Sequence, residues 1–197
     1  MKPSYQGFEA KKNSGYLTLP PEGAYVAEIQ AVRSVPADEK HDRDVIELKI
    51  EITEGEYANR YTEFFKDQDE KFGNAKYKGV FRLTCPKADD EDWRKRTFEG
   101  NLWCVEQSNP GYTWDWDENK LKGKKVGISV RKRLYTYNGK DKETTEIGRF
   151  ETIDDVRNGK VKPMNPRDQR EAAEESASTD GSGFTDVSNN SAVEVPW

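Results

Sequence analysis

The sequence predicts a mainly β protein: a five-stranded Greek-key barrel with one helix between the third and fourth strands, followed by a disordered C-terminal tail. Three observations carry this prediction. Residues 45–54 alternate apolar and charged side chains, as a strand with one buried face does. An Asn138-Gly139 pair separates two strand-like segments, and this dipeptide is a strong signal for a β-hairpin. Between these regions, residues 89–108 carry the signals of a helix.

The composition fits one small domain with separable ends. Charged residues make up 35% of the 197 residues, but aromatic residues make up 11% and cluster within the first 150 positions. We expect a flexible arm at residues 1–16, the barrel at residues 17–160 and a disordered acidic tail at residues 161–197. From residue 165 onward seven acids stand against two bases, which accounts for the whole net charge of −5. An acidic total is therefore compatible with a nucleic-acid partner.

The first three strands are expected at residues 24–35, 45–54 and 59–65. In the second, the isoleucines and Leu48 should point inward, and Glu47, Lys49 and Glu51 should face water. Residues 66–86 are predicted to form a loop with room for an extra strand or hairpin. Residues 89–108 combine acids in the first turn with apolar residues near helical spacing, which predicts the helix.

Cys85 and Cys104 form no paired motif, and the N-terminus has no hydrophobic signal segment. Both thiols are therefore expected to be reduced and buried, in a cytoplasmic protein.

The last two strands fold about Asn138-Gly139, which predicts a type I′ turn. This turn sets Val130 opposite Ile147 and Arg131 opposite Glu146, with Gly148 as a candidate bulge, and residues 151–156 close the domain. Three strands, a helix and a hairpin is the element order of the OB-fold, a barrel that binds oligonucleotides across one face.

The strand at residues 126–137 carries the main functional signal. Its apolar side chains point one way, whereas Arg131, Arg133, Tyr135 and Tyr137 point the other. It lies in a segment, residues 120–142, with nine cations and one acid. Alternating cations and rings suit single-stranded nucleic acid, because the cations neutralise phosphates and the rings stack on bases. A solvated strand with ordinary surface residues is the alternative.

Further members of this predicted site are Lys122, Lys124 and Lys125, with Tyr61, Phe64, Trp114 and Trp116 as additional stacking candidates. Glu47 and Glu51 oppose phosphate binding on the second strand. The ligand is therefore expected to run along the fourth and fifth strands. Because stacking and phosphate contacts serve both nucleic acids, DNA and RNA remain alternatives.

The C-terminus carries the second signal, an apolar tip on an acidic tether. The tip residues Glu194, Val195, Pro196 and Trp197 have no core to join, so they are available to a partner protein with a basic-rimmed hydrophobic pocket. A tail of this sign is also able to compete with nucleic acid for the basic strand.

These features resemble single-stranded-DNA-binding proteins, and in particular the small ones encoded by phages and prophages. The resemblance covers about residues 17–157 and the final residues. It includes the stretches PEGAY (21–25), EITEGEY (51–57) and LKGKKV (121–126). It implies an OB-fold that binds DNA and a tail that recruits replication, recombination and repair proteins in the cytoplasm of the host cell. The tail departs from the usual bacterial ending, since Glu194 stands alone where a dense acidic run is common.

Two rival functions stay open. Asp44, Glu47 and Lys49 are reminiscent of metal-dependent nucleases, although the spacing is tight and an amphipathic strand explains it. A protein-interaction or inhibitor module that does not touch DNA is the other rival. His41 is the only histidine and no Walker-type loop is present, so we expect no catalysis, no cofactor and no metal.

Overall fold

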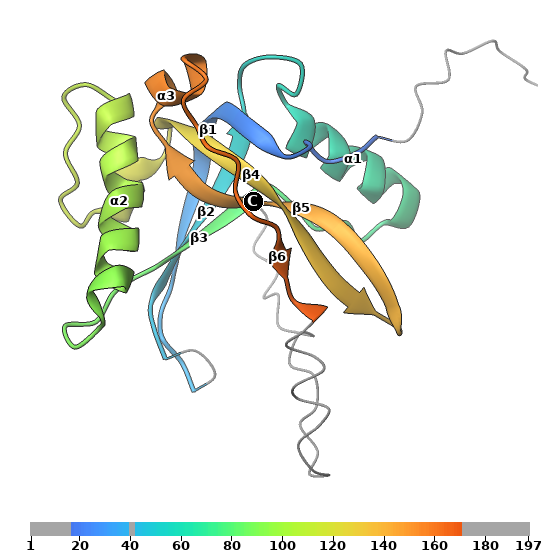
Figure 1. The fold of residues 1–197 in the computed structure, drawn as a ribbon, viewed down its shortest axis with the longest axis horizontal. Coiled ribbons are helices and arrows are strands. Elements are labelled where there is room, and N and C mark those ends of the chain that lie inside the picture. Colours follow the sequence, from blue (N-terminus) through green and yellow to red (C-terminus); the bar gives the residue numbers. More distant parts are fainter. Residues whose placement is uncertain (1–16, 40–41, 171–197) are drawn as a thin grey trace, which may run out of the picture.

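The computed structural model describes residues 17–39 and 42–170. Its centre is an open mixed sheet of six strands, with the order β3-β2-β1-β4-β5 and with β6 parallel to β4 (Figure 1). The strands are β1 (Gly23–Val35), β2 (Val45–Ile52), β3 (Val80–Thr84), β4 (Lys125–Tyr137), β5 (Lys140–Glu151) and β6 (Arg167–Asp168). The helices are α1 (Arg60–Phe72), α2 (Asp92–Ser108), η1 (Glu118–Leu121) and α3 (Ile153–Arg157).

The sheet is curled around one apolar core. The edge strands β3 and β5 approach each other, with the rings of Phe81 and Phe150 4.5 Å apart between centroids. No backbone ladder joins these edges within the described ranges, so the sheet stays open. The helix α2 covers β4 and β5 on one side of the molecule (Figure 1). Asn101 of α2 fixes this packing because its side-chain oxygen accepts the Phe150 N–H at 2.8 Å.

The predicted hairpin is confirmed in register and in turn geometry. Asn138 and Gly139 have φ values of 52° and 68°, as a type I′ turn requires. Val130 pairs with Ile147 and Arg131 pairs with Glu146. The ladder shifts between Ser129 and Val130 and leaves Gly148 as the extra residue, so the predicted bulge is also confirmed.

The strand predicted at residues 59–65 is wrong, because these residues begin α1. The cause is the carboxylate of Glu51, at the end of β2, which accepts the backbone N–H groups of Tyr61 at 3.1 Å and Thr62 at 2.7 Å. A carboxylate at a helix N-terminus satisfies otherwise unpaired N–H groups and is attracted by the helix dipole. The third strand of the sheet is instead β3. It lies within residues 66–86, where the sequence predicts a loop with room for an extra strand or hairpin.

The strand β2 is buried on both faces, which the alternating pattern did not predict. The apolar set points inward as expected, but Glu47 and Glu51 are only 5% and 1% exposed. Glu51 is enclosed by α1 and by the Tyr77 hydroxyl, which donates to it at 2.9 Å. Neither carboxylate therefore faces water.

Order continues past the predicted domain end at residue 160, since β6 lies within the stretch expected to be tail. The predicted arm, residues 1–16, and the predicted partner-binding tip, Glu194 to Trp197, lie outside the described residues. None of the helices in the described ranges combines the length and the apolar composition needed to cross a bilayer.

Candidate nucleic-acid interface

The four side chains that define the predicted interface lie on one face of the β4–β5 ribbon. Val126, Ile128 and Val130 of β4 belong to the core, and the alternating positions Arg131, Arg133, Tyr135 and Tyr137 point away from it. Residues directly paired across an antiparallel ladder share a face, so Lys142 and Lys140 lie beside Tyr135 and Tyr137. Each of the two rings on the outer half of the ribbon therefore has a lysine beside it on the neighbouring strand.

Arg131 is the least available of these cations. Its guanidinium bonds Glu146 on β5, with Nε at 3.0 Å and Nη2 at 2.9 Å from the same carboxylate oxygen. Its side chain is 24% exposed, and Arg167 of β6 approaches the same carboxylate at 3.8 Å. One acid thus compensates much of the charge of two arginines at this level of the ribbon.

The outer half of the ribbon is more accessible. The Arg133 guanidinium lies 5.6 Å from the centre of the Tyr135 ring, and the Lys142 ammonium lies 5.7 Å from that of Tyr137. The Tyr137 side chain is 58% exposed. Two cation–ring pairs are thus displayed next to the hairpin turn, and we call Arg133, Tyr135, Tyr137, Lys140 and Lys142 the outer ribbon face.

A crossing segment, residues 158–166, covers the inner half of the same ribbon. It runs from α3 to β6 in front of β4 and β5 (Figure 1). The Lys162 carbonyl accepts a 3.5 Å hydrogen bond from Arg149, and Met164 lies against Gly148. Beneath the segment is a cavity of about 240 Å³ bounded by Gly23, Ala24, Ser129 and Val130. A ligand that follows β4 toward its N-terminal end meets this segment.

Further cations near the ribbon come from the stretch before β3. The Lys78 side chain is exposed overall, but partial burial, followed by the positive charges of Lys76 and Arg133, lowers its pKa. Three cations therefore gather between this stretch and β4. Sequence reasoning missed them because residues 66–86 had no assigned structure, and the lysines at 76 and 78 belong to no strand.

The structure does not bring the other predicted lysines to the ribbon face. Lys122, Lys124 and Lys125 lie at the opposite end of β4 from the hairpin turn. At about 3.3 Å per residue, the thirteen residues of β4 separate these two ends by roughly 40 Å. Lys124 instead lies 4.5 Å from the centre of the Tyr112 ring.

Two of the predicted stacking residues belong to α1. Tyr61 is 2% exposed and part of the core, so its prediction as a stacking platform is wrong. Phe64 is half-buried on the same helix. Both residues were expected on a strand at residues 59–65. Because residues 60–72 form a helix, neither side chain is on the expected strand face.

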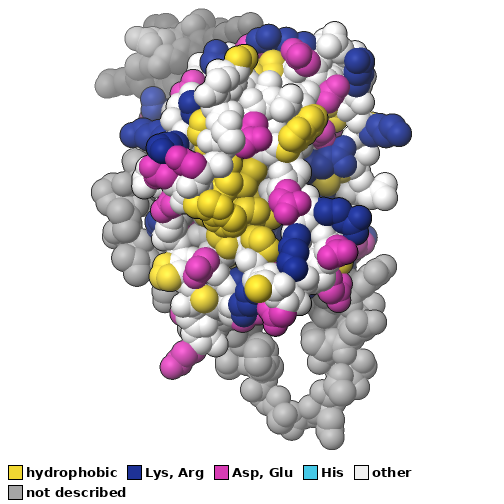
Figure 2. Space-filling model, turned by 90° about the vertical axis from the view of Figure 1, so that its left-hand side faces the viewer, with side chains coloured by type: hydrophobic (Ala, Val, Ile, Leu, Met, Phe, Trp, Pro, Cys, Tyr) yellow, Lys and Arg dark blue, Asp and Glu magenta, His cyan; other side chains and the backbone are white. Residues whose placement is uncertain are grey.

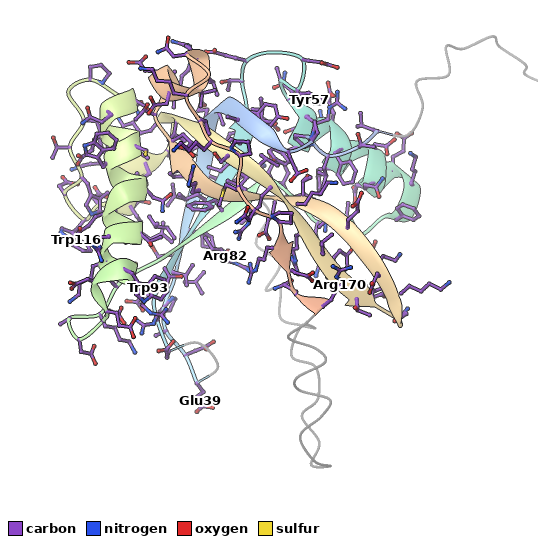
Figure 3. The ribbon with its side chains drawn as sticks, viewed as in Figure 1. Glu39, Tyr57, Arg82, Trp93, Trp116 and Arg170 are labelled. Atoms are coloured by element: carbon purple, nitrogen blue, oxygen red, sulfur yellow. The ribbon has the colours of Figure 1, made fainter. Side chains whose placement is uncertain are left out.

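Trp114 and Trp116 lie on the opposite side of the molecule. Trp116 stacks on Phe98 of α2, with 5.9 Å between ring centroids and 20° between planes. Figure 3 shows Trp116 beside α2, whereas Arg170 lies below the β4–β5 ribbon at the other side. The two tryptophans therefore do not share a surface with the outer ribbon face.

The residues considered for a nuclease are committed to structural contacts. Glu47 accepts hydrogen bonds from Arg33 Nε at 2.9 Å and from Arg82 Nε at 2.7 Å. Burial disfavours its ionised form, but these arginines outweigh burial and lower its pKa. Asp44 accepts the Ala37 N–H at 2.7 Å. Within residues 17–39 and 42–170, no group of three or more His, Cys, Asp or Glu side chains is placed to hold a metal ion.

In comparisons with known sequences, no protein-family model and no curated protein matches this chain.

Proposed function

We propose that this protein binds single-stranded DNA with little sequence preference and without catalysis, and that the outer ribbon face is its main contact. We also propose that the fold is an open variant of the OB-fold barrel. This reading is supported by the curled sheet, by α2 between β3 and β4, and by the close approach of Phe81 and Phe150. The insertion of α1 between β2 and β3 and the addition of β6 are departures from the five-stranded pattern.

The observation that carries the proposal is the pairing of rings with cations on the outer ribbon face. Each exposed ring offers a stacking surface worth about 1–3 kcal/mol per base, and any base is able to use it. Each cation in contact with a phosphate releases bound counterions from the DNA. Bases in a duplex are stacked on one another, so the rings favour the single strand.

In the cell such a protein would cover strands exposed during DNA replication, recombination or repair. The sequence of the C-terminal tip supports an added role in recruiting partner proteins.

The direct test is fluorescence anisotropy of a labelled oligo-dT with the full-length chain across a salt series. We expect tight binding at low salt, weaker binding to the matched duplex, and a linear fall of log K with log salt concentration. The double variant Arg133→Ala/Lys142→Ala should weaken binding and reduce the magnitude of the salt slope by about 1.4, or about 0.7 per lost phosphate contact. An unlabelled oligo-U competitor reports the preference between DNA and RNA.

The matched control is Arg94→Ala/Lys95→Ala on α2, which removes the same two charges from the opposite side of the molecule. It should leave affinity and slope close to those of the parent chain. Equal binding to duplex, no binding at low salt, or equal effects of the two double variants would each refute the proposal. Oligonucleotide cleavage on addition of Mg²⁺ would instead favour the nuclease.

A protein-interaction role is the second candidate. The observation that favours it is the exposure of Trp93, Trp103 and Trp116 on the α2 side, at 51%, 52% and 69%. Figure 2 shows that apolar side chains gather into one patch on this side of the molecule. The two roles use different surfaces, so one chain is able to carry both.

A further inference from the structure

A groove opens between the loop after α2 and the paired ends of β1 and β2. It encloses about 240 Å³ and is lined by Val35, Pro36, Val45, Cys85, Trp114 and Trp116, with Asp44 and Glu118 among its polar members. The two indoles are 6.0 Å apart between centroids and inclined by 56°, so they form an open corner and not a closed sandwich. We call this the Trp114–Trp116 groove.

The loop that carries the two indoles is held in place. The Trp114 backbone N–H donates to the Glu106 carboxylate of α2 at 2.8 Å. Trp116 has a φ of 68°, a left-handed conformation that is unusual for a bulky residue, and its ring is supported by Phe98. Despite this support the Trp116 side chain is 69% exposed. The indole is thus displayed to solvent by a pinned loop, which lowers the ordering cost of binding a ligand.

Two acidic side chains, Asp44 and Glu118, line the groove. The Asp44 carboxylate accepts the Ala37 backbone N–H at 2.7 Å, and the Glu118 carboxylate accepts the Ser34 hydroxyl at 2.6 Å. Both donors are neutral, and neither carboxylate has an ion-pair partner within the described ranges. Burial, followed by the negative charges of these two carboxylates, raises the pKa of the Cys85 thiol. Both charges therefore act inside the groove, and they would repel a phosphate backbone.

We propose that the Trp114–Trp116 groove binds a basic segment of a partner protein, with an arginine or lysine side chain seated against the two indoles. The face of an indole attracts a cation, and Asp44 and Glu118 complement its charge. This inference does not depend on the proposed DNA binding, because it uses a separate surface of opposite charge.

The test follows the indole N–H resonances of the five tryptophans of the full-length chain by ¹H–¹⁵N NMR. The probe is the capped peptide Gly-Arg-Gly-Arg-Gly, and its control is the same peptide with citrulline, the neutral isostere of arginine. The Trp114 and Trp116 signals are assigned with the variants Trp114→Phe and Trp116→Ala. We expect the arginine peptide to shift both signals and to bind at least tenfold more tightly than the citrulline peptide.

Two variants and a matched control sharpen the result. Trp116→Ala should lower the affinity for the arginine peptide at least fivefold, and Glu118→Gln should lower it about threefold. Trp93→Ala removes an exposed indole of α2 that is stacked with Arg94 outside the groove, and it should have no effect. Because the Trp116 ring covers the core residue Phe98, urea denaturation should first show that Trp116→Ala remains folded.

Several outcomes would overturn the inference. They are no shift of the two signals at millimolar peptide, equal binding of the citrulline peptide, and equal effects of Trp93→Ala and Trp116→Ala. Shifts of the same signals with oligo-dT would assign the groove to nucleic acid. Shifts that depend only on protein concentration would assign it to a second copy of the chain.

Discussion

Arg133 of β4 and Gln169, the residue after β6, are joined by a 2.6 Å hydrogen bond from the guanidinium Nε to the side-chain oxygen. The Gln169 backbone N–H also donates to the Leu134 carbonyl at 2.9 Å. Gln169 thus fixes both the backbone and a key cation of β4. The guanidinium is oriented beside Tyr135 before any ligand arrives, and the end of the crossing segment is tied to the outer ribbon face.

The two arginines of the ribbon should differ in their contribution to DNA binding. Arg131→Ala should weaken oligo-dT binding by less than about 0.5 kcal/mol, because Glu146 already compensates its charge. Glu146→Gln should tighten binding, since it frees Arg131 and Arg167 from their shared acid. Anisotropy titrations at fixed salt check both variants, and a larger loss for Arg131→Ala than for Arg133→Ala would contradict this reading.

The exposed ring next to the turn should act by stacking. Tyr137→Ala is expected to cost about 1–3 kcal/mol of binding free energy, and Tyr137→Trp should retain the affinity. The salt slope should be unchanged in both variants, because no charge is removed. Phe72→Ala on α1, which removes a ring that is 69% exposed elsewhere, serves as the matched control.

Gly148 should control how tightly the crossing segment is held. A Cβ at this position would lie 2.6 Å from the Met164 sulfur, the movable end of a flexible side chain. Gly148→Ala should therefore loosen residues 161–169 and change the free energy of unfolding by less than about 1 kcal/mol. Hydrogen exchange at the Gln169 amide should accelerate. Gly79→Ala is the contrasting variant, because its Cβ would clash with the Ile50 carbonyl oxygen, and it should destabilise the whole fold.

Removal of the Glu51 carboxylate should be among the most damaging single changes. Glu51→Ala leaves the N–H groups of Tyr61 and Thr62 and the Tyr77 hydroxyl without this acceptor. A loss of about 3–5 kcal/mol in the free energy of unfolding is expected in urea denaturation. Glu63→Ala, an exposed acid on the same helix, should change it by less than about 0.5 kcal/mol.

Tyr61 and Tyr77 should respond oppositely to loss of their hydroxyls. The Tyr61 hydroxyl is buried without an acceptor among the described residues, so Tyr61→Phe should be neutral or stabilising by about 1 kcal/mol. Tyr77 donates to the Ile50 carbonyl and to Glu51, both at 2.9 Å, so Tyr77→Phe should cost about 1–2 kcal/mol. Urea denaturation at neutral pH separates the two.

The same phenols predict a loss of stability in alkali. Burial, and after it the charge of Glu51, raises the pKa values of Tyr61 and Tyr77. A raised folded-state pKa means that the folded chain holds these protons more tightly than the unfolded chain does. The stabilisation is therefore complete below about pH 10, the ordinary tyrosine pKa, and is lost as the pH rises toward the folded-state values. Absorbance of phenolate against pH should show the two groups titrating late, and Tyr61→Phe should flatten the decline.

The sequence predicts the hairpin well because its determinants are local. Asn138-Gly139 favours positive φ at both turn positions, and the turn then fixes the pairing of Arg131 with Glu146. The face carrying Arg133 and Tyr135 follows from the two-residue period of a strand.

The errors come from contacts between distant parts of the chain. Glu51 looks like a solvent-facing residue of an amphipathic strand, but it is buried because α1 folds back over it. The start of α1 depends on this same contact, so residues 59–65 and Glu51 were misassigned together. The positions of Trp114 and Trp116 depend on how the loop packs against Phe98, and no local pattern encodes this.

The last described residue, Arg170, bonds Asp168 and approaches Asp141 of the hairpin at 3.3 Å. The 27 residues that follow are therefore tethered next to the turn between β4 and β5. The acids of these residues are part of the same polypeptide as the outer ribbon face. Their effective concentration at that face is therefore on the order of millimolar and does not depend on the protein concentration. If the outer ribbon face binds DNA as proposed, the DNA strand would compete there with tail acids whose local concentration does not fall on dilution.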